Sequence, residues 1–142
     1  MSFEDLPANV SQLPLTTGQL RADVIDLIIL EEDRAAGCVG LMVCDSEDRG
    51  IQPVVFKDVP DDAGRVEFGT FLDLVLPLVG ETNGSVVIGR GRPRGTRPTD
   101  SDRAWHEQAI QSCREHGVRL LGFHLATCDG VFALPEPLQH AS

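Results

Sequence analysis

The chain contains 142 residues, 42% of them hydrophobic, and it carries a formal net charge of −10. This length and composition are typical of a single globular domain with a core of its own. The negative charge argues against a general binder of nucleic acids or membrane surfaces, because their phosphate groups would repel the protein. No apolar run is long enough to span a membrane, and the N-terminal stretch lacks the apolar segment of a signal peptide, so we expect a cytoplasmic protein.

An irregular arm and a helix are predicted at the start of the chain. Residues 1–15 combine scattered apolar residues with prolines, which favours an N-terminal arm. From Leu20 onward, apolar residues recur at the spacing i, i+4, i+7 and i+8, which is one face of a helix. We expect this helix to begin after Thr16 or Thr17, either of which can cap it, and to continue to about Arg34. The residues predicted to face the core are Leu20, Val24, Leu27 and Ile28.

A pair of strands and a second helix are predicted next. The apolar runs 38–45 and 51–56 are separated by turn-forming residues, so they predict two adjacent strands. Pro53 favours an edge position or a bulge for the second strand, because proline cannot donate a hydrogen bond to a neighbouring strand. Residues 66–83 predict a helix with these residues inward: Phe68, Phe71, Leu72, Val75 and Leu76.

The second half of the chain predicts a strand, an arginine-rich loop, a helix and two final strands. Residues 84–90 have the apolar composition of a buried strand. Thr99 or Ser101 can cap the helix, which we expect to end near His116. The last two strands are predicted at 118–127 and 131–134.

The order of these elements predicts the fold class. Helices and strands alternate only in part, so we expect an α/β (α+β) fold with a mixed central β-sheet flanked by helices. One domain is predicted over residues 16–135, and residues 136–142 are predicted to form a C-terminal tail.

Histidines and cysteines receive structural interpretations. His124 lies in an apolar strand and is predicted to be packed and hydrogen-bonded, whereas His106 and His116 are predicted on the helix surface. The cysteines show neither a C-x-x-C pair nor the spacing of metal ligands. We therefore expect buried thiols at Cys38, Cys44, Cys113 and Cys128.

The stretch GRGRPRG, residues 89–95, begins a positive island in an acidic chain. Its four arginines, with no acidic residue between them, are Arg90, Arg92, Arg94 and Arg97. In one interpretation they pair with Asp100, Asp102 or the acidic N-terminal half. In a second they bind a phosphate or carboxylate at the start of the following helix. In a third they enter the minor groove of A·T-rich DNA, since R-G-R-P also resembles the core of the AT-hook.

The order of motifs in residues 86–134 resembles the JAB/MPN metalloprotease family, most closely its RadC-like branch. In that branch a buried strand precedes H-x-H-P-S-G, and P-T-x-S-x-x-D opens a helix. A strand of the type LLDH, a GDG turn and a short apolar strand follow. This chain has SVVIG, RGRPRG, PTDS, LLGFH, CDG and VFAL in the same order. The resemblance implies a JAB/MPN, cytidine-deaminase-like architecture.

The site residues depart from the pattern that the resemblance supplies. In the family, two histidines and an aspartate hold a zinc ion, and a glutamate acts as the general base. Here Arg90 and Arg92 stand at the histidine positions, and Ala104 stands at the aspartate position in the register set by Ser101. Asp102 becomes a ligand only if the register shifts. A guanidinium stays protonated and has no lone pair for a metal, so we expect neither zinc nor peptidase activity.

The resemblance thus implies the fold without the family's activity. We expect a cytoplasmic bacterial pseudoenzyme without a cofactor, which acts as a protein-binding scaffold or regulatory partner through the former active-site groove or the sheet edge. The sequence does not identify the partner. A homodimer is one candidate, because the helices at 20–30 and 66–79 offer surplus apolar surface. The alternative function is nucleic-acid or phosphate-ligand binding through the loop at residues 90–97.

Overall fold

The computed structural model describes residues 14–135, which form a mixed α/β fold. The helices are α1 (Gly18–Ile28), α2 (Glu31–Ala36), α3 (Arg65–Glu81) and α4 (Asp100–Glu115). The strands are β1 (Cys38–Cys44), β2 (Gly50–Lys57), β3 (Ser85–Gly91), β4 (Arg119–Thr127) and β5 (Gly130–Ala133). The predicted α+β class with a mixed central sheet is confirmed. Among residues 14–135, no helix combines the length and apolar composition needed to cross a bilayer.

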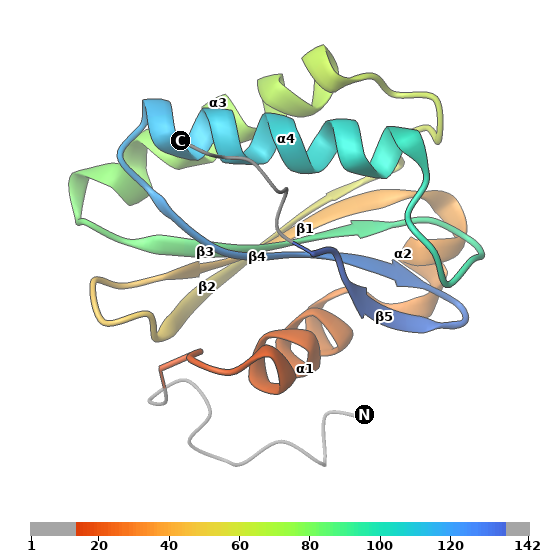
Figure 1. Ribbon diagram of the computed structural model, residues 1–142, viewed down its shortest axis with the longest axis horizontal. Helices are drawn as coiled ribbons and strands as arrows, with labels where there is room; N and C mark the ends of the chain where they lie inside the picture. Colours follow the sequence, from red (N-terminus) through yellow and green to blue (C-terminus); the bar gives the residue numbers. More distant parts are fainter. Residues whose placement is uncertain (1–13, 136–142) are drawn as a thin grey trace.

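The five strands form one sheet in the order β2-β1-β3-β4-β5. β1 pairs antiparallel with both β2 and β3, β3 pairs parallel with β4, and β5 returns antiparallel to β4. α3 and α4 lie side by side over one face of the sheet, and α1 covers the other face (Figure 1). β2 is an edge strand, so the position predicted from Pro53 is confirmed.

Two apolar clusters lie on opposite faces of the sheet. The larger cluster, under α3 and α4, contains Phe68, Trp105 and Phe123, and the Phe68 and Trp105 rings stack with centroids 4.6 Å apart. The smaller cluster, over α1, contains Ile25 and Ile29, both with no exposed surface. Because β1 and β3 are central strands, their side chains alternate between the two clusters, as expected for a sheet buried on both faces.

The first predicted helix is wrong in its end point. α1 ends at Ile28, Ile29 adopts an extended conformation, and a separate helix α2 begins at Glu31. The break is stabilised by Arg34, whose guanidinium donates hydrogen bonds to the carbonyls of Ile29 (2.9 Å) and Asp26 (3.2 Å). A helix end leaves carbonyls unpaired, and Arg34 satisfies them where continued helical turns would otherwise do so.

The core-facing residues of α1 also differ from the prediction. Val24 is buried as predicted, but Ile25 and Ile29 carry the main contact, and Leu27 and Ile28 are only partly buried. The break after α1 turns Ile29 toward the sheet, where it packs closely over Gly40 and Gly89.

The predicted arm and tail lie mostly outside the described residues. Of residues 1–15, the structure describes the last two, and both contact the turn after β1. Pro14 forms an isolated bridge with Arg49, and Leu15 is buried and donates its N–H to the carbonyl of Asp48 at 2.8 Å. The predicted tail at 136–142 is likewise outside the described part of the chain.

Candidate functional site

The arginine stretch begins inside β3, not in an open loop. Val86, Ile88 and Arg90 alternate along β3 toward the α3–α4 layer, so Arg90 extends the apolar row at the end of the strand. Arg90 is 2% exposed, and its guanidinium carbon lies 3.9 Å from the centroid of the Trp105 ring. This distance is that of a cation–π contact.

The glycines on either side of Arg90 are explained by packing on the opposite face. A Cβ atom at Gly89 would lie 2.8 Å from a side-chain carbon of Ile25. A Cβ atom at Gly91 would lie 2.3 Å from the sulfur of Cys38. The alternation of glycine and arginine therefore follows from the two faces of a strand, since one face has no room for a side chain.

Asp102 is the acceptor at the centre of the site. It lies in the first turn of α4, where the Thr99 hydroxyl accepts the N–H of Asp102 at 3.2 Å. In return, the carboxylate of Asp102 accepts the N–H of Thr99 at 2.8 Å. This reciprocal capping box begins the helix and fixes the carboxylate, which has no exposed surface.

Both arginines donate to this one carboxylate. Arg90 Nη1 lies 3.0 Å from Asp102 Oδ1, and Arg92 Nη2 lies 2.8 Å from Asp102 Oδ2. A second Arg92 nitrogen, Nε, lies 3.3 Å from Oδ1. We call these three residues, Arg90, Arg92 and Asp102, the arginine–aspartate cluster.

Further donors of the two guanidiniums bind neighbouring oxygen atoms. Arg90 donates to the Ser101 hydroxyl at 2.8 Å and to the Asp61 carbonyl at 2.9 Å. Arg92 donates to the carbonyl of Arg97 at 3.0 Å and to that of Arg94. The loop after β3 therefore folds around the Arg92 side chain, and the segment before α3 covers Arg90.

Electrostatics favour the ionised cluster. Burial alone would raise the pKa of Asp102, but hydrogen bonds from Arg92 and the Thr99 N–H, with the charges of both arginines, lower it below its ordinary value. Burial lowers the pKa of Arg90, and the Asp102 charge opposes that shift. Since a guanidinium remains protonated in proteins, two cations share one anion in a site with little access to water.

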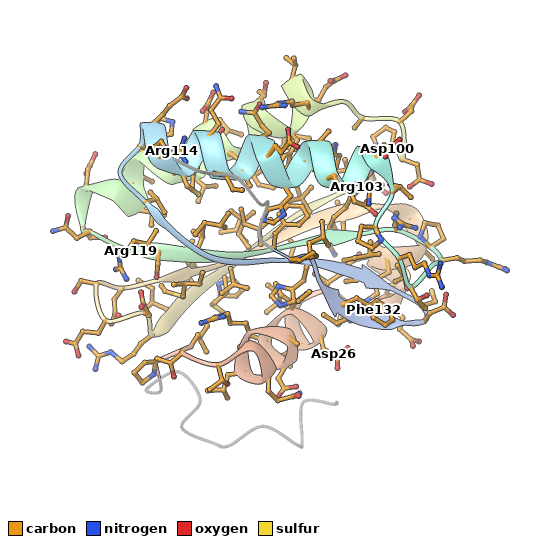
Figure 2. The ribbon with its side chains drawn as sticks, in the orientation of Figure 1. Asp26, Asp100, Arg103, Arg114, Arg119 and Phe132 are labelled. Carbon is orange, nitrogen blue, oxygen red and sulfur yellow. The ribbon has the colours of Figure 1, made fainter. Side chains whose placement is uncertain are left out.

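The structure brings together four of the seven predicted site residues. Arg90 and Arg92 pair with Asp102, as one interpretation predicted, and Arg90 also contacts Ser101. Asp102, rather than Asp100, is the partner. The Asp100 side chain is fully exposed and pairs with Arg103 at 2.8 Å, at the outer end of α4 (Figure 2).

The side chains of the other three predicted site residues lie outside the cluster, although Arg92 contacts the backbone carbonyls of Arg94 and Arg97. Ala104, expected at the family's aspartate position, is only partly buried and takes no part in the contacts, whereas Asp102 meets both arginines. Arg94 and Arg97 are exposed, and within residues 14–135 their guanidiniums form no ion pair. An anion bound at this loop would contact the Arg94 and Arg97 side chains, because Arg90 and Arg92 already form ion pairs with Asp102.

The residues of the cluster do not fit a zinc ion. Zinc is held by thiolate, imidazole and carboxylate groups, and here one carboxylate is flanked by two cations. Across the described part of the chain, no group of three histidine, cysteine or acidic side chains is placed to hold a metal.

One histidine prediction and one cysteine prediction need correction. His106 is 3% exposed and stacks on Phe123 with ring centroids 5.1 Å apart, so it is not a surface residue. It follows Trp105 on the buried face of α4, and this position in an apolar stripe could have revealed it. His116, at the end of α4, is partly exposed, as its predicted surface position allows, and its Nε2 lies 3.2 Å from Asp73 Oδ1. Cys128, expected to be buried, is exposed, while the other three cysteines are buried.

His124 is packed as predicted, but without the predicted hydrogen bond. The residue is 2% exposed, and neither ring nitrogen makes a hydrogen bond of normal geometry to any described residue. Burial lowers the pKa of His124 to about 4, although the backbone of Ile88 favours the charged form. The neutral imidazole thus belongs to the core beneath the sheet.

Comparison with known proteins identifies a partial relative. No family model matches the chain, and no solved structure matches it. The chain is 38% identical over 125 residues to the nicotinate-nucleotide–dimethylbenzimidazole phosphoribosyltransferase of Streptomyces coelicolor. This match covers 86% of the chain but 32% of the relative, so the chain spans about a third of that protein's length.

Proposed function

We propose that the chain is a non-catalytic domain of the RadC-like JAB/MPN type, which acts as a protein-binding scaffold or regulatory partner. The motif order in residues 86–134 supports this assignment. The succession of β3, an arginine loop, α4, β4, a tight turn and β5 is compatible with that order.

The observation that carries the proposal is the arginine–aspartate cluster. In the family that the sequence resembles, the positions of Arg90 and Arg92 hold histidines, and an aspartate from the following helix completes a zinc site. In this chain the two side chains meet a helix aspartate, Asp102, as ion pairs of 3.0 and 2.8 Å. The carboxylate that could bind a metal is instead neutralised by the two guanidiniums.

The cluster also leaves no room for a substrate between its members. Arg90 is 2% exposed and Asp102 is wholly buried. A hydrolytic site needs a reachable electrophile or activated water, and a mutually paired cluster offers neither. Of the two binding surfaces expected from the sequence, the former active-site groove is therefore disfavoured and the sheet edge is favoured.

Metal content and hydrolysis test this proposal. Protein purified without chelator is expected to contain no stoichiometric zinc and to leave peptide and isopeptide substrates uncleaved, with or without added zinc. Elemental analysis and a fluorogenic cleavage assay measure the two properties. Zinc-dependent cleavage that disappears in Asp102→Asn would contradict the proposal.

A second candidate function rests on the Streptomyces relative. The name of that protein implies handling of nicotinate nucleotide, and 38% identity over most of this chain favours a shared property. Arg94 and Arg97, exposed and free of ion pairs among residues 14–135, are the side chains suited to the nucleotide phosphate.

Calorimetric titration with nicotinate mononucleotide separates this candidate from the first. Saturable binding that is lost in Arg94→Ala/Arg97→Ala would favour the nucleotide function. Absence of binding by the folded wild-type chain would remove it and leave the scaffold function in place.

A further inference from the structure

We infer that the groove between β2 and α3 binds an amphipathic helix of a partner protein, with basic residues flanking the apolar stripe of that helix. This inference rests on the proposed binding function and assigns it a surface and a class of partner. We call this surface the β2–α3 groove.

The groove is apolar and open. It has a volume of about 340 Å³, and its lining includes Ile51 and Val54 from β2 and Leu74, Val75 and Leu78 from α3. Three of these side chains are exposed to an unusual degree for their type: Ile51 at 58%, Leu74 at 66% and Leu78 at 67%. A contiguous exposed apolar surface at a sheet edge is typical of an interaction site.

The free edge of β2 is poorly suited to pairing with a further strand. Pro53, near the middle of β2, has no N–H to offer. Its carbonyl already accepts a hydrogen bond from the Gln52 side chain at 3.0 Å. Proline at an edge is one of the devices that prevents strand addition, so a backbone-paired occupant is disfavoured.

A helix suits the groove better. Leu74 and Leu78 are one helical turn apart on α3, and Ile51 lies across the groove from them. A partner helix with apolar residues at i, i+3, i+4 and i+7 can lay its stripe between these ridges without needing backbone pairing.

Charge identifies the kind of helix. Glu67 and Glu81 lie on the same stripe of α3 as the two leucines, one before Leu74 and one after Leu78, by the spacing i, i+7, i+11 and i+14. Glu67 accepts the N–H of Gly64, but neither carboxylate forms an ion pair with a described residue. A partner with lysine or arginine on both sides of its apolar stripe would form ion pairs with these carboxylates.

The cations near β2 are already engaged. Lys57, at the end of the strand, lies 3.8 Å from Asp33. Arg49, just before the strand, lies 2.9 Å from Asp45. The uncompensated charge beside the groove is therefore negative.

The same charges disfavour a second copy of the chain as the occupant. A two-fold, antiparallel pairing of α3 helices that sets Leu74 of one copy against Leu78 of the other would bring Glu67 and Glu81 of opposite copies within about one helical turn of each other. Like charges facing each other across an interface are unfavourable, and each copy carries a net charge of −10.

Fluorescence anisotropy with synthetic helices tests the assignment on the full chain. The probe is a labelled amphipathic peptide of about 18 residues, or five turns, with a leucine stripe flanked by lysines. A matched peptide carries the same stripe flanked by glutamates. The lysine peptide is expected to bind saturably and at least tenfold more tightly than the glutamate peptide, by charge complementarity with Glu67 and Glu81.

Two sets of variants locate the binding. Leu74→Gln/Leu78→Gln is expected to weaken the lysine peptide at least tenfold, whereas Glu67→Gln/Glu81→Gln is expected to remove the preference between the peptides. Val66→Gln is the matched control, because Val66 is 79% exposed on α3 but does not line the groove. All the leucine and valine substitutions are at exposed positions, so the fold is retained, and circular dichroism verifies it.

Several outcomes would overturn the inference. These are no saturable binding of the lysine peptide, equal binding of both peptides, binding unaffected by Leu74→Gln/Leu78→Gln, or a wild-type dimer that this double variant dissociates. Each leaves the non-catalytic assignment intact. Conversely, zinc-dependent hydrolysis would overturn the proposed function without bearing on peptide binding.

Discussion

At the scale of single residues, Asp102 connects the start of α4 to the end of β3. It caps the helix through Thr99 and neutralises Arg90 and Arg92, so three sets of contacts depend on one buried carboxylate. A buried ion pair contributes little compared with an apolar replacement, but removing one partner leaves the other charge buried without compensation. The cluster is therefore sensitive to single substitutions.

Asp102→Asn is expected to lower the free energy of unfolding by about 3–5 kcal/mol, because it leaves two guanidiniums without an anion. Urea denaturation measures the change. Asp100→Asn is the matched control, two residues away with a fully exposed side chain, and it should leave the stability nearly unchanged. Equal effects of the two substitutions would show that the cluster is not structural.

His124 predicts a second residue-scale property, the loss of stability in mild acid. Its pKa is lowered by burial to about 4 in the folded protein, against 6.5 for an ordinary histidine. The unfolded chain therefore binds a proton first as the pH falls. The stabilisation is complete above 6.5 and is lost progressively down to about 4, a total of roughly 3 kcal/mol.

His124→Leu is expected to flatten this dependence, because leucine fills the site without titrating. Unfolding by urea at a series of pH values across that window measures the slope. A wild-type slope matched by the variant would assign the acid sensitivity to other groups.

At the scale of elements, α3 has one buried and one exposed apolar face. Leu76 has no exposed surface, while Leu78, two residues later, is 67% exposed. Leu76→Ala is expected to destabilise by about 2–5 kcal/mol through cavity formation, whereas Leu78→Ala should have almost no effect on the isolated chain. Thermal denaturation compares the two, and a similar loss in both would mean that Leu78 is covered in solution.

The helices and strands that follow a clear period could be predicted from the sequence. The α3 face with Phe68, Leu72 and Leu76 and the edge position of β2 are examples. The break after α1 could not be predicted, because it depends on the position of Arg34. The Arg34 guanidinium donates a hydrogen bond of 3.0 Å to the carbonyl of Thr127, at the end of β4 and far away in the sequence. Local periodicity carries no information about such a contact.

The candidate site was predictable as a set of residues but not as a set of partners. The sequence indicated that the arginines could pair with Asp100 or Asp102. Which aspartate faces the arginines depends on the residue at which α4 begins, and in the structure Asp102 points inward and Asp100 outward. Residue polarity alone predicts a surface position for His106, whereas its place beside Trp105 on the buried stripe of α4 determines its burial.

At the scale of the whole molecule, a net charge of −10 surrounds one small basic loop. Since Arg90 and Arg92 are occupied by Asp102, only Arg94 and Arg97 of that loop remain for an external anion. Each phosphate contact contributes about −0.9 to the slope of log K against log salt concentration. Two such contacts are too few to overcome the repulsion between this acidic protein and DNA.

Duplex DNA is therefore expected not to bind at physiological salt, and A·T-rich and G·C-rich duplexes should behave alike. Anisotropy titrations with both duplexes over a range of salt concentrations measure this. Micromolar, A·T-selective binding that Arg94→Ala/Arg97→Ala abolishes would instead support the DNA interpretation of the loop.

The proposed function requires that the arginine–aspartate cluster occupies the position of a metal centre and blocks metal binding there. Zinc titration of Arg90→His/Arg92→His, followed by elemental analysis and melting temperature, tests it most directly. Two imidazoles with Asp102 supply three protein ligands, which is a complete set for an open zinc site. We predict that the double variant binds one zinc ion and is stabilised by it, that wild type binds none, and that adding Asp102→Asn removes the binding. A folded double variant that binds no zinc, or a wild-type chain that binds as much, would contradict the account.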